Sequence, residues 1–399
     1  MATTPSLTVH HCRRVFEVHK HIDEGLKKDE KKKGVLHMKN ESRILPVVYP
    51  PINGYPHKGA LFSMLMAREE CKPWVFSNFI QIYTLKDLCN KGIRTGTVDF
   101  FYNLYGDWTH FYLKANPWIK INSMPYDFLK LIKSDIIDFI KTCINRNLYL
   151  FFDIDMYYIP AYKLHFNKSH LLHEIFIYGY DDDKQVFYMG DNTTGKYNHD
   201  LVTYEEIITS TNVILDLYQD NNEDAELYKY KEKSIYMMSV EKNVERNWQD
   251  QHFSQDVFEI NVKKIINDLK EYLLLDNYAE GYKYSNYYVY GIDCYNELLK
   301  FVSHAMENNL HVDRRAFYSF IEHKKLMLLR MEFLNGNYDL NQLIERYSNL
   351  VNEFNILMSL ILKANMIKEN DLWEKIIVKL KEYKEEEIVL LNEFIKILS

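Results

Sequence analysis

The residues best placed to do chemistry lie in one stretch of this sequence, between His173 and Asn192. Two runs rich in apolar residues, His173 to Tyr180 and Val186 to Gly190, are separated by the polar residues Asp181 to Lys184. A short polar turn between two such runs is typical of a β-hairpin. We therefore expect the two ends of the stretch, which carry an imidazole, a carboxylate and an amide, to lie side by side.

The register of this hairpin decides which side chain meets the imidazole. For a turn at Asp182 and Asp183, His173 faces Asn192, and a slip of one residue places it opposite Asp191. Cross-strand partners lie about 5 Å apart at Cβ. An imidazole beside a carboxylate or amide is the base and the orienting group of a nucleophilic catalytic site. The alternative is a surface hairpin whose polar ends are only solvated.

The hairpin belongs to a region in which helix and strand patterns alternate. Periodicity predicts helices at Lys58 to Arg68, Pro73 to Cys89 and Tyr126 to Asn145, and further strands at Ile44 to Tyr49, Leu148 to Ile154, Val213 to Tyr218 and Ile235 to Val240. The pattern predicts an α+β domain with an antiparallel sheet, to which we assign residues 38–245.

The character of the chain changes beyond Val240, where proline is absent. Apolar residues recur at helical spacing in four segments, 258–273, 317–334, 340–361 and 376–398. Asp339 with Gln342 resembles a capping box at the start of the third segment. We expect an all-α C-terminal domain at residues 246–399, with short loops near residues 335–337 and 368–370.

Composition excludes several classes of protein. The chain has 399 residues and a net charge of −7, without a basic face for nucleic acid. No stretch approaches 18 apolar residues and the N-terminus has no signal-peptide core, so we expect a cytoplasmic protein without a membrane span. The glycine motifs of dinucleotide and P-loop folds are absent. The ligand-type residues His165, His170, His173, Asp153 and Asp155 lack the spacing of a zinc site, so no metal is expected.

The charged segments and cysteines outside the hairpin have structural interpretations that involve no chemistry. Residues 1–37 carry few apolar residues and are predicted to be a disordered extension, with Met38 as an alternative start. The five cysteines are odd in number and widely spaced, as in free thiols. The charged groups at residues 314–315 and 323–324 are interpreted as surface charge, with binding of a phosphate or an acidic protein as the alternative.

The pattern His-x-apolar-x-apolar-x-Gly-Tyr-Asp, followed by Phe-Tyr-x-x-Asp, carries a family resemblance. It resembles the His-containing hairpin of papain-like cysteine enzymes of the C39-like group, and more closely the N-terminal domain of the butirosin biosynthesis protein H family. The runs at residues 289–291, 313–315 and 322–324, followed by helices, are similar to that family's C-terminal region. The resemblance covers about residues 44–399.

The resemblance implies a papain-like domain followed by a helical domain, with His173 as base and Asp191 as its orienting group. Asn192 is the alternative orienting group. The sequence departs from the family at the nucleophile, because the family's Cys opens the first long helix, which here starts near Gly54 and contains no Cys. The nearest thiol is Cys71, just before a predicted helix whose N-terminus would lower a thiol pKa. A small buried residue is the alternative interpretation of Cys71.

Two further residues complete the expected site. Ser63 is the second candidate nucleophile, and Asn53 is the candidate oxyanion donor because no Gln precedes Gln81. The resemblance implies an acyltransferase of a specialised pathway, such as nonribosomal peptide or aminoglycoside antibiotic biosynthesis. Cys71 would take an acyl group from the phosphopantetheine arm of an acyl or peptidyl carrier protein, and His173 would deprotonate the thiol and then the amine acceptor. No other cofactor is expected.

Two other functions stay open for the same residues. One is a catalytically degenerate papain-like scaffold that binds a carrier protein or a peptide without chemistry. The other is a cysteine peptidase, in which water replaces the amine as acceptor. A homodimer also stays open as the assembled state.

Overall fold

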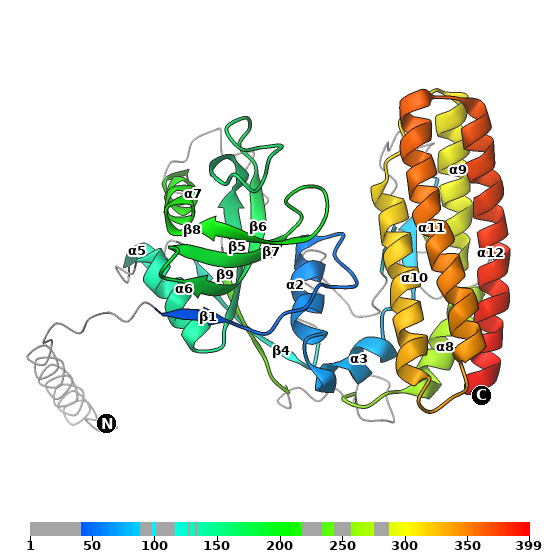
Figure 1. Cartoon of the computed structure of the whole chain (residues 1–399), viewed down its shortest axis with the longest axis horizontal. Coiled ribbons are helices and arrows are strands. Elements are labelled where there is room, and N and C mark those ends of the chain that lie inside the picture. The colour runs from blue at the N-terminus through cyan, green and yellow to red at the C-terminus, as the bar shows by residue number, and fades with distance from the viewer. Residues whose placement is uncertain are drawn as a thin grey trace, which may run out of the picture. The chain divides into compact units, whose positions relative to one another are not determined.

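The computed structural model of the chain describes residues 41–87, 98–100, 116–126, 128–131, 135–217, 234–242, 257–274 and 287–399. The predicted extension at residues 1–37 and the alternative start at Met38 lie outside the described residues. The chain from Arg43 to Ser399 forms one compact unit that mixes helices and strands (Figure 1). An antiparallel sheet followed by a helical region confirms the α+β prediction at this level.

The larger sheet carries the predicted hairpin. It has the strand order β4-β9-β5-β6-β7-β8, with β1 paired to β6 outside this order. The strands are β1 (Ser42–Ile44), β4 (Ile119–Pro125), β5 (Tyr149–Asp155), β6 (Leu172–Asp181), β7 (Val186–Asp191), β8 (Asn198–Thr203) and β9 (Ser234–Val240). All described pairs along that order are antiparallel, and every residue of β5 is buried. Full burial means that both faces of β5 are covered.

Helices cover the two faces of this sheet. They are α2 (Pro56–Leu65), α5 (Phe128–Leu131), α6 (Ile136–Asn145) and α7 (Tyr204–Leu217), and the short helix α3 (Lys72–Ser77) follows α2 along the chain. Helix α2 packs on β6 and β7, whereas α6 and α7 pack on β5. Pro56 occupies the first turn of α2, where its missing N–H leaves no unpaired donor.

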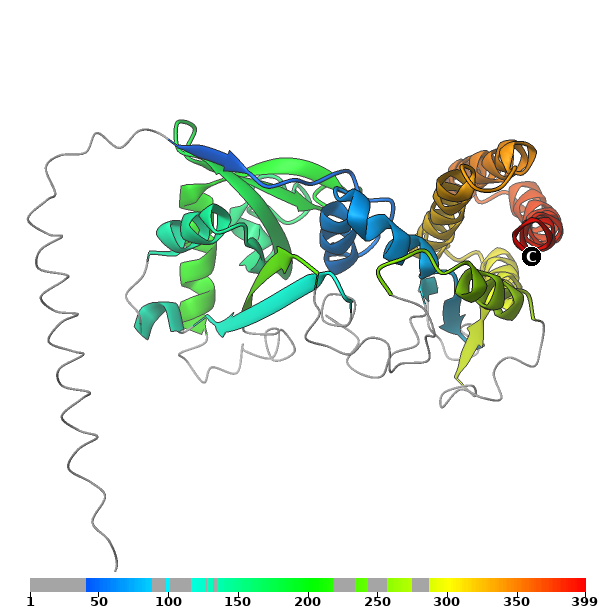
Figure 2. The ribbon, with the colours of Figure 1, turned by 90° about the horizontal axis from the view of Figure 1, so that it is seen from below.

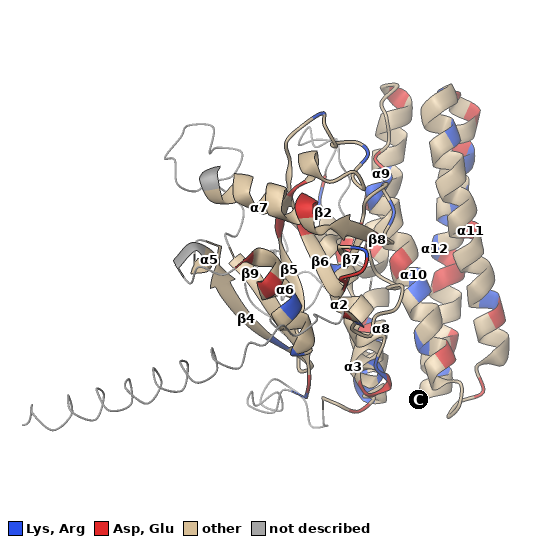
Figure 3. Ribbon diagram, turned by 60° about the vertical axis from the view of Figure 1, so that its left-hand side comes forward, with Lys and Arg blue, Asp and Glu red and all other residues tan. Residues whose placement is uncertain are grey.

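The C-terminal helices pack against one another as predicted. They are α8 (Val262–Leu273), α9 (Cys294–Glu307), α10 (Arg315–Leu334), α11 (Asn341–Ile367) and α12 (Asn370–Leu398). Helix α11 packs on α10 and α12, and α12 packs also on α8 and α9. Acidic and basic residues are interspersed along α11 and α12 (Figure 3).

A smaller sheet joins the two predicted domains. Its order is β10-β2-β3, with β2 (Ile82–Leu85) between β3 (Val98–Phe100) and β10 (Tyr288–Tyr290). Helix α10 packs on β3, and α3 packs on α8 and α10 (Figure 2). Segments from both sides of residue 245 therefore share one sheet.

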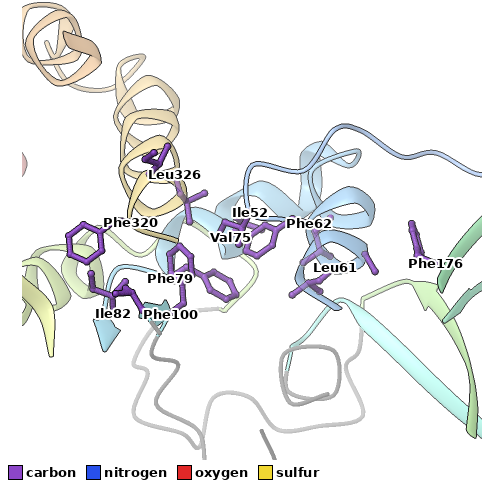
Figure 4. Close-up of a cluster of buried hydrophobic side chains, with 14 of the residues drawn as sticks. Ile52, Leu61, Phe62, Val75, Phe79, Ile82, Phe100, Phe176, Phe320 and Leu326 are labelled. Atoms are coloured by element: carbon purple, nitrogen blue, oxygen red, sulfur yellow. The ribbon is translucent and has the colours of Figure 1, made fainter. Parts of the chain in front are cut away.

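The hydrophobic core runs through both regions without a break. Phe176 of the larger sheet lies at one end of a cluster that continues through Leu61 and Phe62 of α2 to Val75 of α3 (Figure 4). Phe320 of α10 lies at its other end. We infer that the sheet and the helices fold around a shared core.

The prediction of a helix at Pro73 to Cys89 is wrong in its second half. Helix α3 ends at Ser77, Asn78 is extended and Phe79 has a φ of 56°, which a continuing helix does not allow. The apolar and β-branched residues that follow form β2 instead. A buried guanidinium compensates this early end, because Arg330 donates to the carbonyls of Phe76 and Asn78.

The strand predicted at Val213 to Tyr218 is also wrong, since the described residues 213–217 belong to α7. A capping box explains the helix: Thr203 N donates to Glu206 Oε2 (2.8 Å) and Glu206 N donates to Thr203 Oγ1 (3.2 Å). The capping box predicted at Asp339 is not formed, because α11 has Leu340 as its N-cap and no side-chain cap.

One described helix meets the length and hydropathy of a membrane span. Within α11, an 18-residue window has a mean hydropathy of 1.3 and is 33% buried. The same helix supplies Tyr347, Phe354 and Ile361 to the core of the helical region. Length and composition alone single it out, as they do for core helices of many soluble proteins.

Candidate functional site

The hairpin of β6 and β7 brings the imidazole of His173 to the carboxylate of Asp191. Nε2 of His173 lies 3.2 Å from Oδ1 and 3.0 Å from Oδ2 of Asp191. Asn192, the alternative partner, instead donates its side-chain amide to the carbonyl of Asn53 (2.9 Å). The structure therefore pairs the ring with the carboxylate and not with the amide.

The contact arises from a register that differs by one residue from the predicted one. Phe176 pairs with Gly190, and the same register continued to the strand end sets Asp191 opposite Ile175. His173 is then the diagonal neighbour of Asp191 on the same face, within reach of a long side chain. The prediction that His173 stands directly opposite its partner is wrong, although the two groups meet.

The carboxylate is held from three sides. Besides the imidazole, Tyr162 Oη donates to Oδ2 (2.5 Å) and the backbone N–H of Asn192 donates to Oδ1 (2.6 Å). Burial and the nearby Asp191 raise the pKa of Tyr162, so its hydroxyl stays a donor. The Asp191 side chain is 0% exposed, whereas that of His173 is 20% exposed. Burial fixes the carboxylate, and part of the ring still reaches solvent.

Helix α2 packs on the face of the sheet opposite to the face that carries His173. Successive side chains of a strand alternate between faces, so His173 shares a face with its cross-strand neighbour Ile154, and Phe176 lies on the opposite face. Phe176 is the residue that continues into the cluster with Leu61 of α2 (Figure 4). The alternation therefore separates the imidazole from α2, the helix that carries the nucleophile in the family resembled.

Cys71 does not show the properties expected of a nucleophile. Its side chain is 0% exposed, and burial raises the pKa of the thiol to about 12, with a further rise from Glu70. The expectation that a helix N-terminus lowers this pKa is wrong, because loss of solvation outweighs the dipole of a six-residue helix. Burial raises the pKa of Tyr149, with a further rise from the nearby Cys71 thiol, and the Tyr149 ring stacks on Phe176 (5.8 Å between ring centroids). The thiol thus lies on the side of α2.

Ser63 also lies on the α2 side of the sheet, where its hydroxyl has a hydrogen-bond partner. It is 0% exposed, and its Oγ lies 3.0 Å from the hydroxyl of Tyr197. Tyr197 fits between Gly59 of α2 and Gly190 of β7, where an added Cβ would come within 2.5 Å and 2.2 Å of its ring carbon and hydroxyl. Two glycines and a tyrosine thereby set the close approach of α2 to the sheet.

Asn53 is buried and forms only internal hydrogen bonds among those described. Its amide donates to Pro50 O (2.8 Å), and its Oδ1 accepts from Tyr318 Oη (2.7 Å). Its backbone N–H donates to Glu322 Oε1, and its carbonyl accepts from Asn192. These contacts give Asn53 a structural link between elements in place of the predicted oxyanion donation.

Sequence reasoning missed a second histidine–carboxylate pair at the same end of the sheet. His170 Nδ1 lies 2.7 Å from Oδ2 of Asp155, which is 0% exposed. The His170 ring stacks on Tyr157 (4.2 Å between centroids) and is 48% exposed on its side chain. The sequence offers both residues only as candidate metal ligands. In the described part of the chain, no group of three or more ligand-type residues that could hold a metal occurs.

Neither a family model nor a curated protein matches this chain in the comparisons with known proteins.

Proposed function

We propose that this protein is an acyltransferase with a papain-like sheet domain, in which His173 acts as general base and no enzyme thiol takes part. The observation that carries the proposal is the buried Asp191 carboxylate holding the partly exposed imidazole of His173 at 3.0 Å. A carboxylate in this position fixes the ring's orientation and stabilises its protonated form. The resemblance to the butirosin biosynthesis protein H family supplies the acyl-transfer chemistry.

The acyl group moves in one direct exchange. With Nε2–H of His173 donating to Asp191, the basic lone pair lies on Nδ1. Nδ1 accepts a proton from the acceptor amine as the nitrogen attacks the thioester carbonyl and the C–N bond forms. The tetrahedral intermediate then collapses, the C–S bond breaks, and the leaving thiolate takes the proton from the imidazolium. One thioester and one amine give one amide and one free thiol.

The burial of both candidate nucleophiles, Cys71 and Ser63, on the α2 side of the sheet suits this route. The thiol of Cys71 is neutral at physiological pH because burial raises its pKa to about 12. A thioester is itself an activated acyl donor, so a deprotonated amine attacks it without prior transfer to the protein. We infer a carrier protein with a phosphopantetheine arm as donor and an amine as acceptor.

The test uses acetyl-, butyryl- and glycyl-pantetheine with glycinamide as the acceptor, and measures release of free thiol. We expect His173→Gln to lower kcat/KM by about 10² to 10⁴-fold, the usual worth of a general base. Cys71→Ser should stay within about threefold of the natural protein. Loss of activity in Cys71→Ser alone, or no thiol release above the protein-free rate with any donor, would overturn the proposal.

A binding scaffold without chemistry is the second candidate, favoured by the separation of both Cys71 and Ser63 from the face of His173. The same assay, together with a measurement of carrier binding, separates the two, because a scaffold gives no turnover but still binds the carrier. Saturable binding of an acylated carrier protein that is unchanged by His173→Gln, without thiol release, would identify the scaffold. Thiol release that does not need glycinamide would identify hydrolysis, as in a peptidase.

A further inference from the structure

A run of hydrogen bonds leads from the helical region to the His173–Asp191 pair. Glu322 of α10 accepts from the backbone N–H groups of Asn53 and of Gly54, the latter at 2.8 Å. The carbonyl of Asn53 accepts from the side chain of Asn192 (2.9 Å). The backbone N–H of Asn192 donates to the carboxylate of Asp191 (2.6 Å).

Glu322 is built into this position. It is 3% exposed, and Tyr318, one helical turn earlier on α10, donates its hydroxyl to the side chain of Asn53 (2.7 Å). An added Cβ at Gly54 would come within 3.0 Å of Glu322 Oε2, so the backbone approaches the carboxylate closely. Without Glu322, two N–H groups of the buried segment before α2 would lose their acceptor.

We propose that Glu322 is a positioning residue of the His173 site, through which α10 fixes Asn53, Asn192 and the Asp191 carboxylate in turn. This gives the C-terminal helices a part in the chemistry of the sheet, which neither the fold nor the resemblance assigns. The inference deepens the proposed function, and it rests on that function only for the effect on turnover. Its effect on the imidazole can be measured whether or not the protein transfers acyl groups.

The chemistry of the acceptor predicts which variants retain the link. A glutamine side chain still offers a carbonyl oxygen to the two N–H groups, whereas alanine offers none. We therefore expect Glu322→Gln to hold the segment before α2 as the natural protein does and Glu322→Ala to loosen it. Glu332→Ala is the matched control, because Glu332 lies exposed on the same helix.

The experiment follows the Nε2–H resonance of His173 by proton–nitrogen NMR of the full chain, together with kcat and KM for butyryl-pantetheine and glycinamide. We expect Glu322→Ala to broaden or lose this resonance and to lower kcat about 10- to 100-fold with KM within about twofold. Glu322→Gln and Glu332→Ala should retain both. Asn192→Ala should match Glu322→Ala, and the double variant should be no worse than either single one.

An unchanged resonance in folded Glu322→Ala, or effects of Glu322→Ala and Asn192→Ala that add in full, would overturn the inference. If Glu322→Ala does not fold, Tyr318→Phe decides, because it removes only the hydroxyl that donates to Asn53. Weakening of the resonance in that variant supports the link, and an unchanged resonance refutes it. If the variants change the resonance as expected but the natural protein releases no thiol, the proposed function fails while the positioning role stands.

Discussion

Two buried carboxylates, Asp191 in the sheet and Glu387 in the helices, are held by similar groups and differ in what they leave exposed. Glu387 accepts from Lys324 Nζ (2.7 Å), Tyr295 Oη (2.7 Å) and Tyr347 Oη (3.1 Å). Asp191 has a histidine in place of the lysine and a tyrosine donor as well. Both side chains of the Lys324–Glu387 pair are 0% exposed, whereas His173 is 20% exposed.

This difference in exposure distinguishes the Lys324–Glu387 pair, a structural cluster, from the His173–Asp191 pair, a candidate site. The Lys324 ammonium lies 4.8 Å from the centroid of Phe320 and also contacts the hydroxyl of Tyr272 and the ring of Tyr295, so no ligand can replace its partners. Its buried neighbour His323 donates to the carbonyl of Ile80 (2.7 Å). A sealed pair of this kind specifies packing. The imidazole of His173 is 20% exposed, so it can exchange a proton with a molecule that reaches it from solvent.

The largest expected effect comes from breaking the sealed pair. Lys324→Met should lower the free energy of unfolding by about 3 to 5 kcal/mol, because it leaves a buried carboxylate without its cation. Lys379→Met is the control, since the Lys379–Glu353 pair is partly exposed and should be worth about 1 kcal/mol or less. Urea denaturation measures both. Equal losses in the two variants would contradict the distinction between sealed and open pairs.

A smaller effect is expected from the pH dependence of Glu322. Burial raises the pKa of this carboxyl to about 7, above its value in the unfolded chain, so the folded state binds the proton more tightly. Its contribution is therefore full below about pH 4.5 and is lost as the pH rises towards 7. Relative to Glu322→Gln, the natural protein should lose about 1 to 3 kcal/mol of stability across this window.

The groups that face Glu322 set the limits of that window. They are Lys58 and Tyr55 from α2 and its cap, and Tyr318 and Lys325 from α10. Burial lowers the pKa of Lys58 to about 7, so the effect of Lys58 on stability changes above pH 7, outside the window of Glu322. Lys58 also pairs with Asp99. A difference between the two proteins that is flat from pH 4.5 to 7 would refute the raised pKa of Glu322.

The smallest expected effect concerns the reaction rates of the buried cysteines, which should not differ in favour of Cys71. Cys71 should react with iodoacetamide in the native protein no faster than Cys143 and Cys294, because all three are buried and burial raises the pKa of each thiol. Mass spectrometry of a variant in which Cys12 and Cys89 are replaced by Ser measures the three rates. Preferential labelling of Cys71 would contradict its assignment as a buried structural residue and would support it as the nucleophile.

The sequence predicts the parts of this protein that depend on local patterns. The hairpin follows from two apolar runs around a polar turn, and the C-terminal helices follow from apolar spacing. The predicted register was wrong because the turn has four residues, 182–185, which shifts the pairing by two residues. The bulge between Ile177 and Gly179 takes back one of them, and the apolar pattern reveals neither feature. Helix α7 was missed because its β-branched residues resemble a strand, and the capping box at Thr203 was overlooked.

The site was predictable only in part, because burial and distant partners leave no local trace. His173 and Asp191 share one hairpin, so sequence spacing brings them together. Tyr162 and Glu322 come from other elements, and Glu322 is 269 residues from Asn53. The prediction that the charges at residues 323–324 lie on the surface is wrong, because His323 and Lys324 are both 0% exposed. A charged residue's type states its chemistry but not its solvent exposure.

The comparison of the two carboxylates depends on the partial exposure of the His173 ring. Diethyl pyrocarbonate modifies accessible neutral imidazoles, and mass spectrometry locates the products. In the native protein we expect carbethoxylation of His173 within minutes, faster still in Asp191→Asn, and of His323 only after unfolding. Protection of His173 equal to that of His323 would contradict an open site and leave both carboxylates as structural clusters.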